Sequence, residues 1–187
     1  MIENNTTEIA LSKSKLTKLL VFSILFLVGG LWMIIKDPLT SNSFFNNPVI
    51  KAIGAYGSTI MGAIGIYFFS RKLFDTKPGL ILSDQGITDN TSIYKLGLIP
   101  WSDILEVYEQ SVQASIASKQ YFLTVSLSDP EKYISKESNG FKKRMMMINL
   151  KSYGSPIHIS TNGLKTNHKD LVKMVNEYFE NYKRLHS

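Results

Sequence analysis

Two long apolar segments stand out in the first half of the chain. Neither Leu19 to Ile35 nor Ala52 to Ser70 contains a charged residue. Because a hydrocarbon core about 30 Å thick needs about 20 helical residues, each segment predicts a helix that crosses a membrane. The pattern therefore predicts a transmembrane hairpin over residues 19–70, with spans at about 17–35 and 50–70, after an N-terminal segment of residues 1–18.

A cleavable signal peptide is the alternative explanation of the first segment. Lys13, Lys15 and Lys18 would form its basic start, and Val28-Gly29-Gly30 resembles a cleavage site. The apolar run continues from Leu31 to Ile35, however, where a mature protein would become polar. The length of the run therefore favours a membrane-spanning helix.

The basic residues around the two segments predict their orientation. Six lie before the first segment or after the second, whereas the connecting stretch holds only Lys36 and Lys51. The six are Lys13, Lys15, Lys18, Arg71, Lys72 and Lys77. Since basic flanks stay in the cytoplasm, we expect both termini there and a short external loop, with Trp32, Phe44 and Phe45 suited to the interface.

A row of small residues marks one face of the second segment. Gly54, Ser58 and Gly62 recur at every fourth position. Inside lipid, helices associate where small side chains let the backbones approach. This face predicts a helix contact, either with the first segment or with a second copy of the protein.

Residues 76–187 have the pattern of a small domain built from short strands. The alternation is clearest in Tyr121–Ser128, where apolar positions alternate with mostly hydroxyl-bearing ones. Asp129 and Pro130 predict the start of a short helix that ends near Lys136. The predicted strands are Leu80–Leu82, Ile87–Asp89, Leu98–Val107, Tyr121–Ser128, Met145–Leu150 and Pro156–Ser160.

A long amphipathic helix closes the chain after Asn167, its predicted N-cap. Its apolar stripe consists of Leu171, Met174, Val175, Tyr178, Phe179, Tyr182 and Leu185. Such a helix must cover apolar surface. The whole pattern predicts an α+β membrane protein, in which a hairpin precedes a small antiparallel β-barrel or bent sheet capped by this helix.

Two segments and the closing helix carry a resemblance to a known group of proteins. The segments are Leu82-Ser83-Asp84-Gln85-Gly86-Ile87 and Gly97-Leu98-Ile99-Pro100-Trp101-Ser102-Asp103-Ile104. With the hairpin, they resemble small bacterial inner-membrane proteins that have two N-terminal spans and a pleckstrin-homology-like (PH-like) domain. The resemblance implies a cytoplasmic PH-like domain over residues 76–187, but no particular activity.

The polar residues predict no catalytic, cofactor or metal site. The absence of cysteine excludes thiolate chemistry. The histidines, which are His158, His168 and His186, do not cluster as ligands of one ion. Glu106 and Glu109 are three positions apart in a predicted strand, so they point to opposite faces and cannot act as a pair.

Trp101 and Asp103 are an aromatic and a carboxylate close together, as at a recognition edge. We expect instead a core tryptophan beside a carboxylate that satisfies neighbouring groups.

Lys142, Lys143 and Arg144 are the strongest local charge feature. Close to a membrane they would meet anionic headgroups at about 1 kcal/mol each. The alternative is a solvated loop before a strand in which Met146, Ile148 and Leu150 are core residues.

These features together predict a membrane-tethered, non-catalytic binding or regulatory module. Its expected partners are the lipid bilayer and another protein, with a homo-oligomer through the second helix as an option. The net charge of +6 comes from scattered lysines and does not predict nucleic-acid binding. An immunity protein that neutralises a toxin at the inner membrane is the alternative, and an enzyme is a more distant one.

Overall fold

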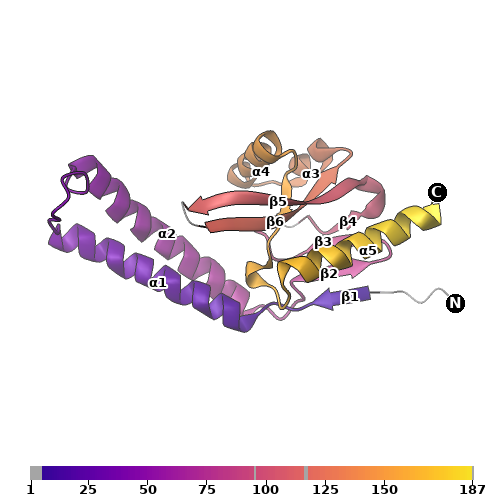
Figure 1. The fold of residues 1–187 in the computed structure, drawn as a ribbon, viewed down its shortest axis with the longest axis horizontal. Coiled ribbons are helices and arrows are strands. Elements are labelled where there is room, and N and C mark those ends of the chain that lie inside the picture. Colours follow the sequence, from indigo (N-terminus) through magenta and orange to yellow (C-terminus); the bar gives the residue numbers. More distant parts are fainter. Residues whose placement is uncertain (1–5, 95, 116–117, 187) are drawn as a thin grey trace. The chain divides into compact units, whose positions relative to one another are not determined.

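The computed structural model describes residues 6–94, 96–115 and 118–186, which form two compact units. Ser12–Thr76 is a pair of long helices, and the described residues up to Leu11 join those from Lys77 onward in an α+β domain (Figure 1). The chain thus leaves the domain once and returns to it once.

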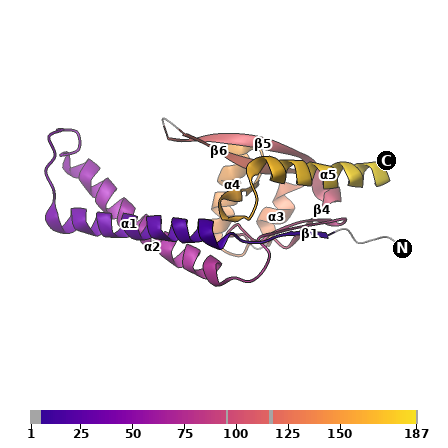
Figure 2. The same ribbon diagram turned by 60° about the horizontal axis from the view of Figure 1, so that its bottom comes forward.

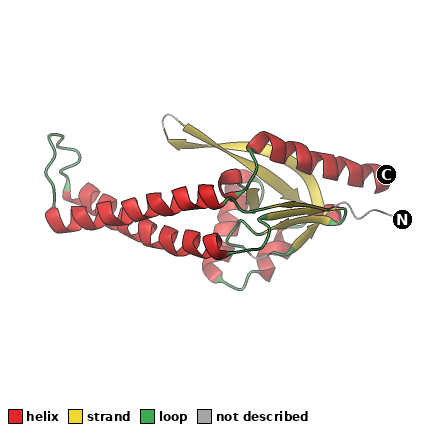
Figure 3. Ribbon diagram, turned by 90° about the horizontal axis from the view of Figure 1, so that it is seen from below, coloured by secondary structure: helices red, strands yellow, loops and turns green. Residues whose placement is uncertain are grey.

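The helical unit consists of α1, Lys13–Lys36, and α2, Pro48–Phe74, which run antiparallel (Figure 3). The side chain of Ser12 caps α1, and Asn47 caps α2 with Pro48 at the first helical position. Both helices are long and apolar enough to cross a membrane, and their large apolar side chains are mostly exposed.

Small residues bring the two helices together. A Cβ atom on Gly62 would lie 2.5 Å from the backbone nitrogen of Leu27 and 2.8 Å from the carbonyl oxygen of Ser23. The backbones of α1 and α2 therefore approach at Gly62. Gly54 has more room, since its added Cβ would meet only the Met33 methyl at 3.6 Å, while Ser58 faces Gly30 of α1.

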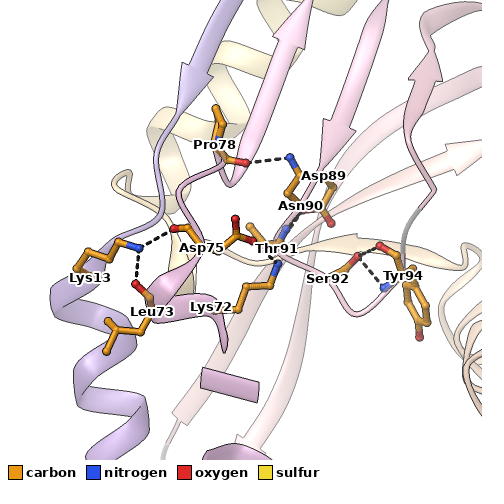
Figure 4. A network of polar contacts seen from close by, with 10 residues as sticks. All are labelled: Lys13, Lys72, Leu73, Asp75, Pro78, Asp89, Asn90, Thr91, Ser92 and Tyr94. Carbon is orange, nitrogen blue, oxygen red and sulfur yellow. Dashed lines mark hydrogen bonds and ion pairs between the residues drawn. The ribbon is translucent and has the colours of Figure 1, made fainter. Parts of the chain in front are cut away.

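Lys13 ties the start of α1 to the end of α2. Its ammonium donates to the carbonyl oxygen of Leu73 and, at 2.7 Å, to that of Asp75 (Figure 4). A cation that binds carbonyls at a helix C-terminus complements the helix dipole. One of the basic residues that predicted the orientation therefore also fixes this end of the hairpin.

The first sheet has the antiparallel order β1-β2-β3-β4. Its strands are β1 Thr6–Ile9, β2 Leu80–Ser83, β3 Gly86–Asp89 and β4 Leu98–Pro100. Strand β1 leads into α1 (Figure 2) yet pairs with β2, which follows α2 (Figure 1). The predicted N-terminal segment of residues 1–18 did not include this strand.

The second sheet has the antiparallel order β5-β6-β7, with β5 Ile104–Ser115, β6 Ser118–Leu127 and β7 Ile157–Ile159. The two sheets are separate, so the closed-barrel form of the prediction is wrong. The predicted strand Leu98–Val107 is divided, because after Pro100 the chain makes a 3-10 turn, Trp101–Asp103, and enters the second sheet. Proline has no N–H for a ladder, which favours a break there.

Three α-helices complete the part of the domain that the structure describes: α3 Pro130–Lys136, α4 Gly140–Tyr153 and α5 His168–His186. The prediction of a strand over Met145–Leu150 is therefore wrong. In a helix, Met146 and Leu150 lie on one face and Ile148 points away, and the exposures agree: Met146 is buried and Ile148 is 45% exposed.

The core forms where α5 packs on both sheets. Leu171, Val175 and Phe179 of α5 are buried as predicted, but Leu185 is exposed. Trp101, at the junction of the sheets, is buried beside Phe179, at a ring-centroid distance of 5.8 Å. The sheets contribute Leu80, Leu82, Ile87, Ile99, Leu123, Val125, Leu127, Ile157 and Ile159.

We expect Gly62→Leu to lower the free energy of unfolding of the hairpin by about 1–3 kcal/mol, because the new side chain must push α1 and α2 apart. The measurement is the melting temperature of the full chain in mild detergent. Gly57→Leu is the matched control, since a Cβ there meets nothing within 4 Å. Equal melting temperatures for the two variants would contradict the close contact at Gly62.

Candidate functional site: the exposed face of helix α4

Helix α4 begins and ends at recognisable caps. The side chain of Asn139 accepts from the backbone N–H of Lys142 at 3.1 Å, and Glu137 in turn accepts from the N–H of Asn139 at 3.0 Å. Gly154 ends the helix in the left-handed conformation, with φ 76° and its N–H bonded to the Leu150 carbonyl. The sequence signals for this helix are therefore the capping residues Asn139 and Gly154, and the prediction of a strand over Met145–Leu150 did not take them into account.

The inward face of α4 joins the helix to the domain. Met146 is fully buried and Leu150 packs against the core. Lys142 also turns inward: its ammonium donates to the carbonyl oxygen of Ile93 at 2.7 Å and lies 4.0 Å from a Glu137 oxygen. Of the three predicted cations, Lys142 is therefore held within the domain.

The outward face of α4 combines cations with exposed apolar side chains. Lys143 and Arg144 are exposed, and Lys151 joins them two turns on. Phe141 is 70% exposed, Met147 46% and Ile148 45%. The helix carries no acidic residue. We call Phe141, Lys143, Arg144, Met147, Ile148 and Lys151 the α4 face.

Such a face suits an anionic boundary between water and an apolar phase. Cations attract phosphate headgroups, and the transfer of aromatic and aliphatic groups out of water is favourable. The sequence pattern pointed to Lys143 and Arg144 but not to Phe141, Ile148 and Lys151 as part of this face, because only a helical period places these three beside the cations.

Trp101 and Asp103 are held by the domain itself. The Trp101 indole donates to the Ser83 carbonyl oxygen at 2.8 Å. One oxygen of Asp103 accepts from the Tyr133 hydroxyl at 2.5 Å and from the Lys132 ammonium at 2.6 Å. These contacts join the turn between the sheets to α3.

The surroundings of Asp103 and Tyr133 shift the pKa values of both side chains. The hydrogen bonds from Lys132 and Tyr133 lower the pKa of the Asp103 carboxyl. Burial, then the bond to that carboxylate, raises the pKa of the Tyr133 phenol. Near neutral pH the pair is thus an ionised carboxylate that accepts a hydrogen bond from a neutral phenol, which is a structural contact.

His158 lies in a buried polar cluster of the second sheet. Its Nε2 is 2.9 Å from the Ser155 carbonyl oxygen, so this nitrogen carries the proton and donates. Its Nδ1 lies 2.9 Å from the hydroxyl of the buried Thr124, and the same hydroxyl lies 3.1 Å from Oε1 of Gln110. Burial lowers the pKa of His158, which favours the neutral ring.

The other histidines and glutamates do not converge. His168 Nε2 lies 2.7 Å from a Glu109 oxygen without forming a hydrogen bond, so the contact is electrostatic when the ring is protonated. Glu106 and His186 are exposed. Within residues 6–94, 96–115 and 118–186, no three histidine, aspartate or glutamate side chains gather as metal ligands.

A small cavity beside His158 is lined by Asp89, Ser92, Tyr94, Leu96, Ile99 and Ile157. Its volume is about 10 Å³, which is room for one water molecule. Nearby, Ser92 is hydrogen-bonded to the backbone of Tyr94, and Thr91 to Asp89 (Figure 4). The α4 face is therefore the stronger candidate for binding.

The Asp103 bonds generate a pH-dependent prediction. Its folded pKa lies below the unfolded value near 3.8, so its stabilisation is complete above that value and is lost as pH falls through the folded pKa. At pH 7, we expect Asp103→Asn to lower the free energy of unfolding by about 1 kcal/mol, a charged hydrogen bond reduced by partial exposure.

The measurement is urea unfolding in a Trp32→Phe background, where Trp101 is the only tryptophan left. The difference in unfolding free energy between the chain that keeps Asp103 and the Asp103→Asn variant should shrink as pH is lowered. Glu131→Gln, which removes an exposed carboxylate from the same region, is the control. A difference independent of pH would contradict a role for the ionised carboxylate.

Comparison of the chain with protein-family models, with curated proteins and with solved structures found no match.

Proposed function

We propose that this protein is a membrane-tethered, non-catalytic binding module of a bacterial inner membrane. The α1–α2 hairpin crosses the bilayer, and the α+β domain is a PH-like domain on the cytoplasmic side. The α4 face binds anionic headgroups at that surface. The exposed combination of cations and apolar side chains on α4 is the observation that carries the binding proposal.

The pairing of β1 with β2 supports an even number of membrane crossings. Residues on both sides of the hairpin belong to one sheet, so both must lie on the same side of the bilayer. The excess of basic residues before α1 and after α2 favours the cytoplasm for that side. Cleavage of a signal peptide near Gly30 would remove β1, which argues against that alternative.

The exposed apolar surface of α1 and α2 supports insertion. Phe22 is 61% exposed, Ile35 74% and Ile53 69%. Apolar surface of this extent would not remain in water unless another apolar phase or protein covered it. Lipid provides that phase along the whole length of both helices.

Because the hairpin tethers the domain to the membrane, a weak electrostatic attraction is sufficient to bring the α4 face to the headgroups. Each of Lys143, Arg144 and Lys151 near an anionic surface contributes about 1 kcal/mol, and burial of Phe141 adds an apolar term. A hairpin in the same bilayer holds the domain at a high effective concentration of headgroups. The arrangement supports orientation by charge without a pocket for one lipid headgroup.

The topology predicts the labelling of single cysteines, since the chain has none of its own. In intact cells, a membrane-impermeant maleimide should label Ser41→Cys in the loop between the helices. It should label Ser138→Cys in the domain only after the membrane is permeabilised. Labelling of Ser138→Cys in intact cells would contradict the cytoplasmic position of the domain.

The α4 proposal is tested with full-length protein in nanodiscs and an environment-sensitive dye on Ser152→Cys. Adding phosphatidylglycerol to phosphatidylcholine discs should shift the dye emission to the blue, as α4 meets the headgroups. The shift should fade with salt, because exposed charges are screened over about 8 Å at physiological ionic strength.

Changing Lys143, Arg144 and Lys151 to glutamine should abolish this shift. The matched control changes Lys119, Lys165 and Lys169, which are exposed elsewhere on the domain, and removes the same charge. A shift that survives the α4 changes, or that the control also abolishes, would mean that the α4 face is not the contact.

A further inference from the structure

A cleft lies between α1 and α2 at the end where their connecting loop joins them. Its volume is about 630 Å³, within the range of ligand sites. Met33 and Ile34 of α1 line one wall, and Ala55 and Tyr56 of α2 line the other, with Phe45 of the loop beside them. These walls are apolar and suit a hydrocarbon chain.

The loop forms an ordered rim around this cleft. The backbone N–H of Thr40 donates to the Asn46 side chain at 2.9 Å, and the Asn46 amide donates to the Thr40 carbonyl oxygen at 2.7 Å. Asn47 then caps α2 by accepting from the N–H of Val49 at 2.9 Å. The loop is thus held by its own hydrogen bonds.

One ion pair stands on the rim with bonding capacity left over. The Lys51 ammonium donates to one oxygen of Asp37 at 2.7 Å. This bond uses one of three N–H groups of Lys51 and one of two oxygens of Asp37. The Lys51 side chain is 15% exposed and that of Asp37 76%, so the carboxylate faces outward beside a partly covered cation.

We infer that this cleft binds one phospholipid whose headgroup carries both a phosphate and a primary ammonium group. An acyl chain lies between the apolar walls, the phosphate accepts from Lys51, and the ammonium donates to Asp37. A zwitterion matches both the remaining N–H groups of Lys51 and the second oxygen of Asp37. A purely anionic headgroup would be repelled by the Asp37 carboxylate. The inference rests on the proposed insertion of the hairpin but not on the α4 contact.

The test measures lipid retained by the full chain after delipidation in mild detergent. The protein is incubated with equal amounts of phosphatidylethanolamine and phosphatidylglycerol of the same acyl chains, and bound lipid is counted by native mass spectrometry. We expect phosphatidylethanolamine to be retained preferentially. Gly54→Leu should reduce retention about tenfold, the equivalent of about 1.4 kcal/mol, because the added side chain occupies the cleft.

Gly57→Leu is the matched control and should retain lipid as the unchanged chain does, since Gly57 lies on the same helix but does not line the cleft. Asp37→Asn should reverse the preference toward phosphatidylglycerol, because Lys51 then lacks its carboxylate. Asparagine tolerates the left-handed backbone of Asp37, φ 39°, so this variant keeps the end of α1 intact.

Three results would overturn the inference. The first is unchanged retention in Gly54→Leu, and the second is a preference for phosphatidylglycerol in the unchanged chain. The third is retention that falls in the α4 glutamine variant, which would place the bound lipid at α4. Extraction of the unchanged chain from membranes by carbonate reports separately on insertion, so failure of the hairpin proposal is distinguished from failure of the cleft alone.

Discussion

Strand β1 precedes both long helices and pairs with β2, which follows them. The first sheet therefore joins two segments that are separated in the sequence by the entire hairpin. Joining distant parts of a chain costs conformational entropy, and the cost is lower when the intervening segment is itself ordered. Here that segment is an antiparallel helical pair fixed by the close approach at Gly62 and by the bonds of Lys13 to the end of α2. The contacts within the hairpin therefore lower the entropic cost of pairing β1 with β2.

The two proposed lipid contacts differ in their physics. The α4 face presents like charges and apolar groups on an open surface, which favours any anionic layer and is sensitive to salt. The cleft presents a cation and an anion side by side at the mouth of an apolar groove, which favours a neutral zwitterion. One contact responds to the mean charge of the membrane, and the other to the chemistry of a single molecule.

The sequence predicted what depends on long or strongly periodic patterns. The apolar runs predicted α1 and α2, the alternation around Leu123 and Val125 predicted β6, and the stripe through Leu171 and Val175 predicted α5. Each of these signals is repeated over several turns or residue pairs, so tertiary contacts did not need to supply it.

The errors arose where few residues carry the pattern. Spacing at Met146, Ile148 and Leu150 fits a strand as well as part of a helix, and the caps at Asn139 and Gly154 decide between them. Four residues of β1 give too little periodicity to predict a strand, and its partner lies far along the chain. The α4 face and the cleft depend on which side chains a fold brings together, which no local pattern contains.

The position of β1 also has a consequence for biogenesis in the proposed topology. The strand leaves the ribosome before either helix, and its partner is made only after both. If just one helix inserted, β1 and β2 would lie on opposite sides of the bilayer and the sheet could not form. Folding of the domain would then act as a check on insertion, since a misinserted chain would expose an unfolded domain to proteases.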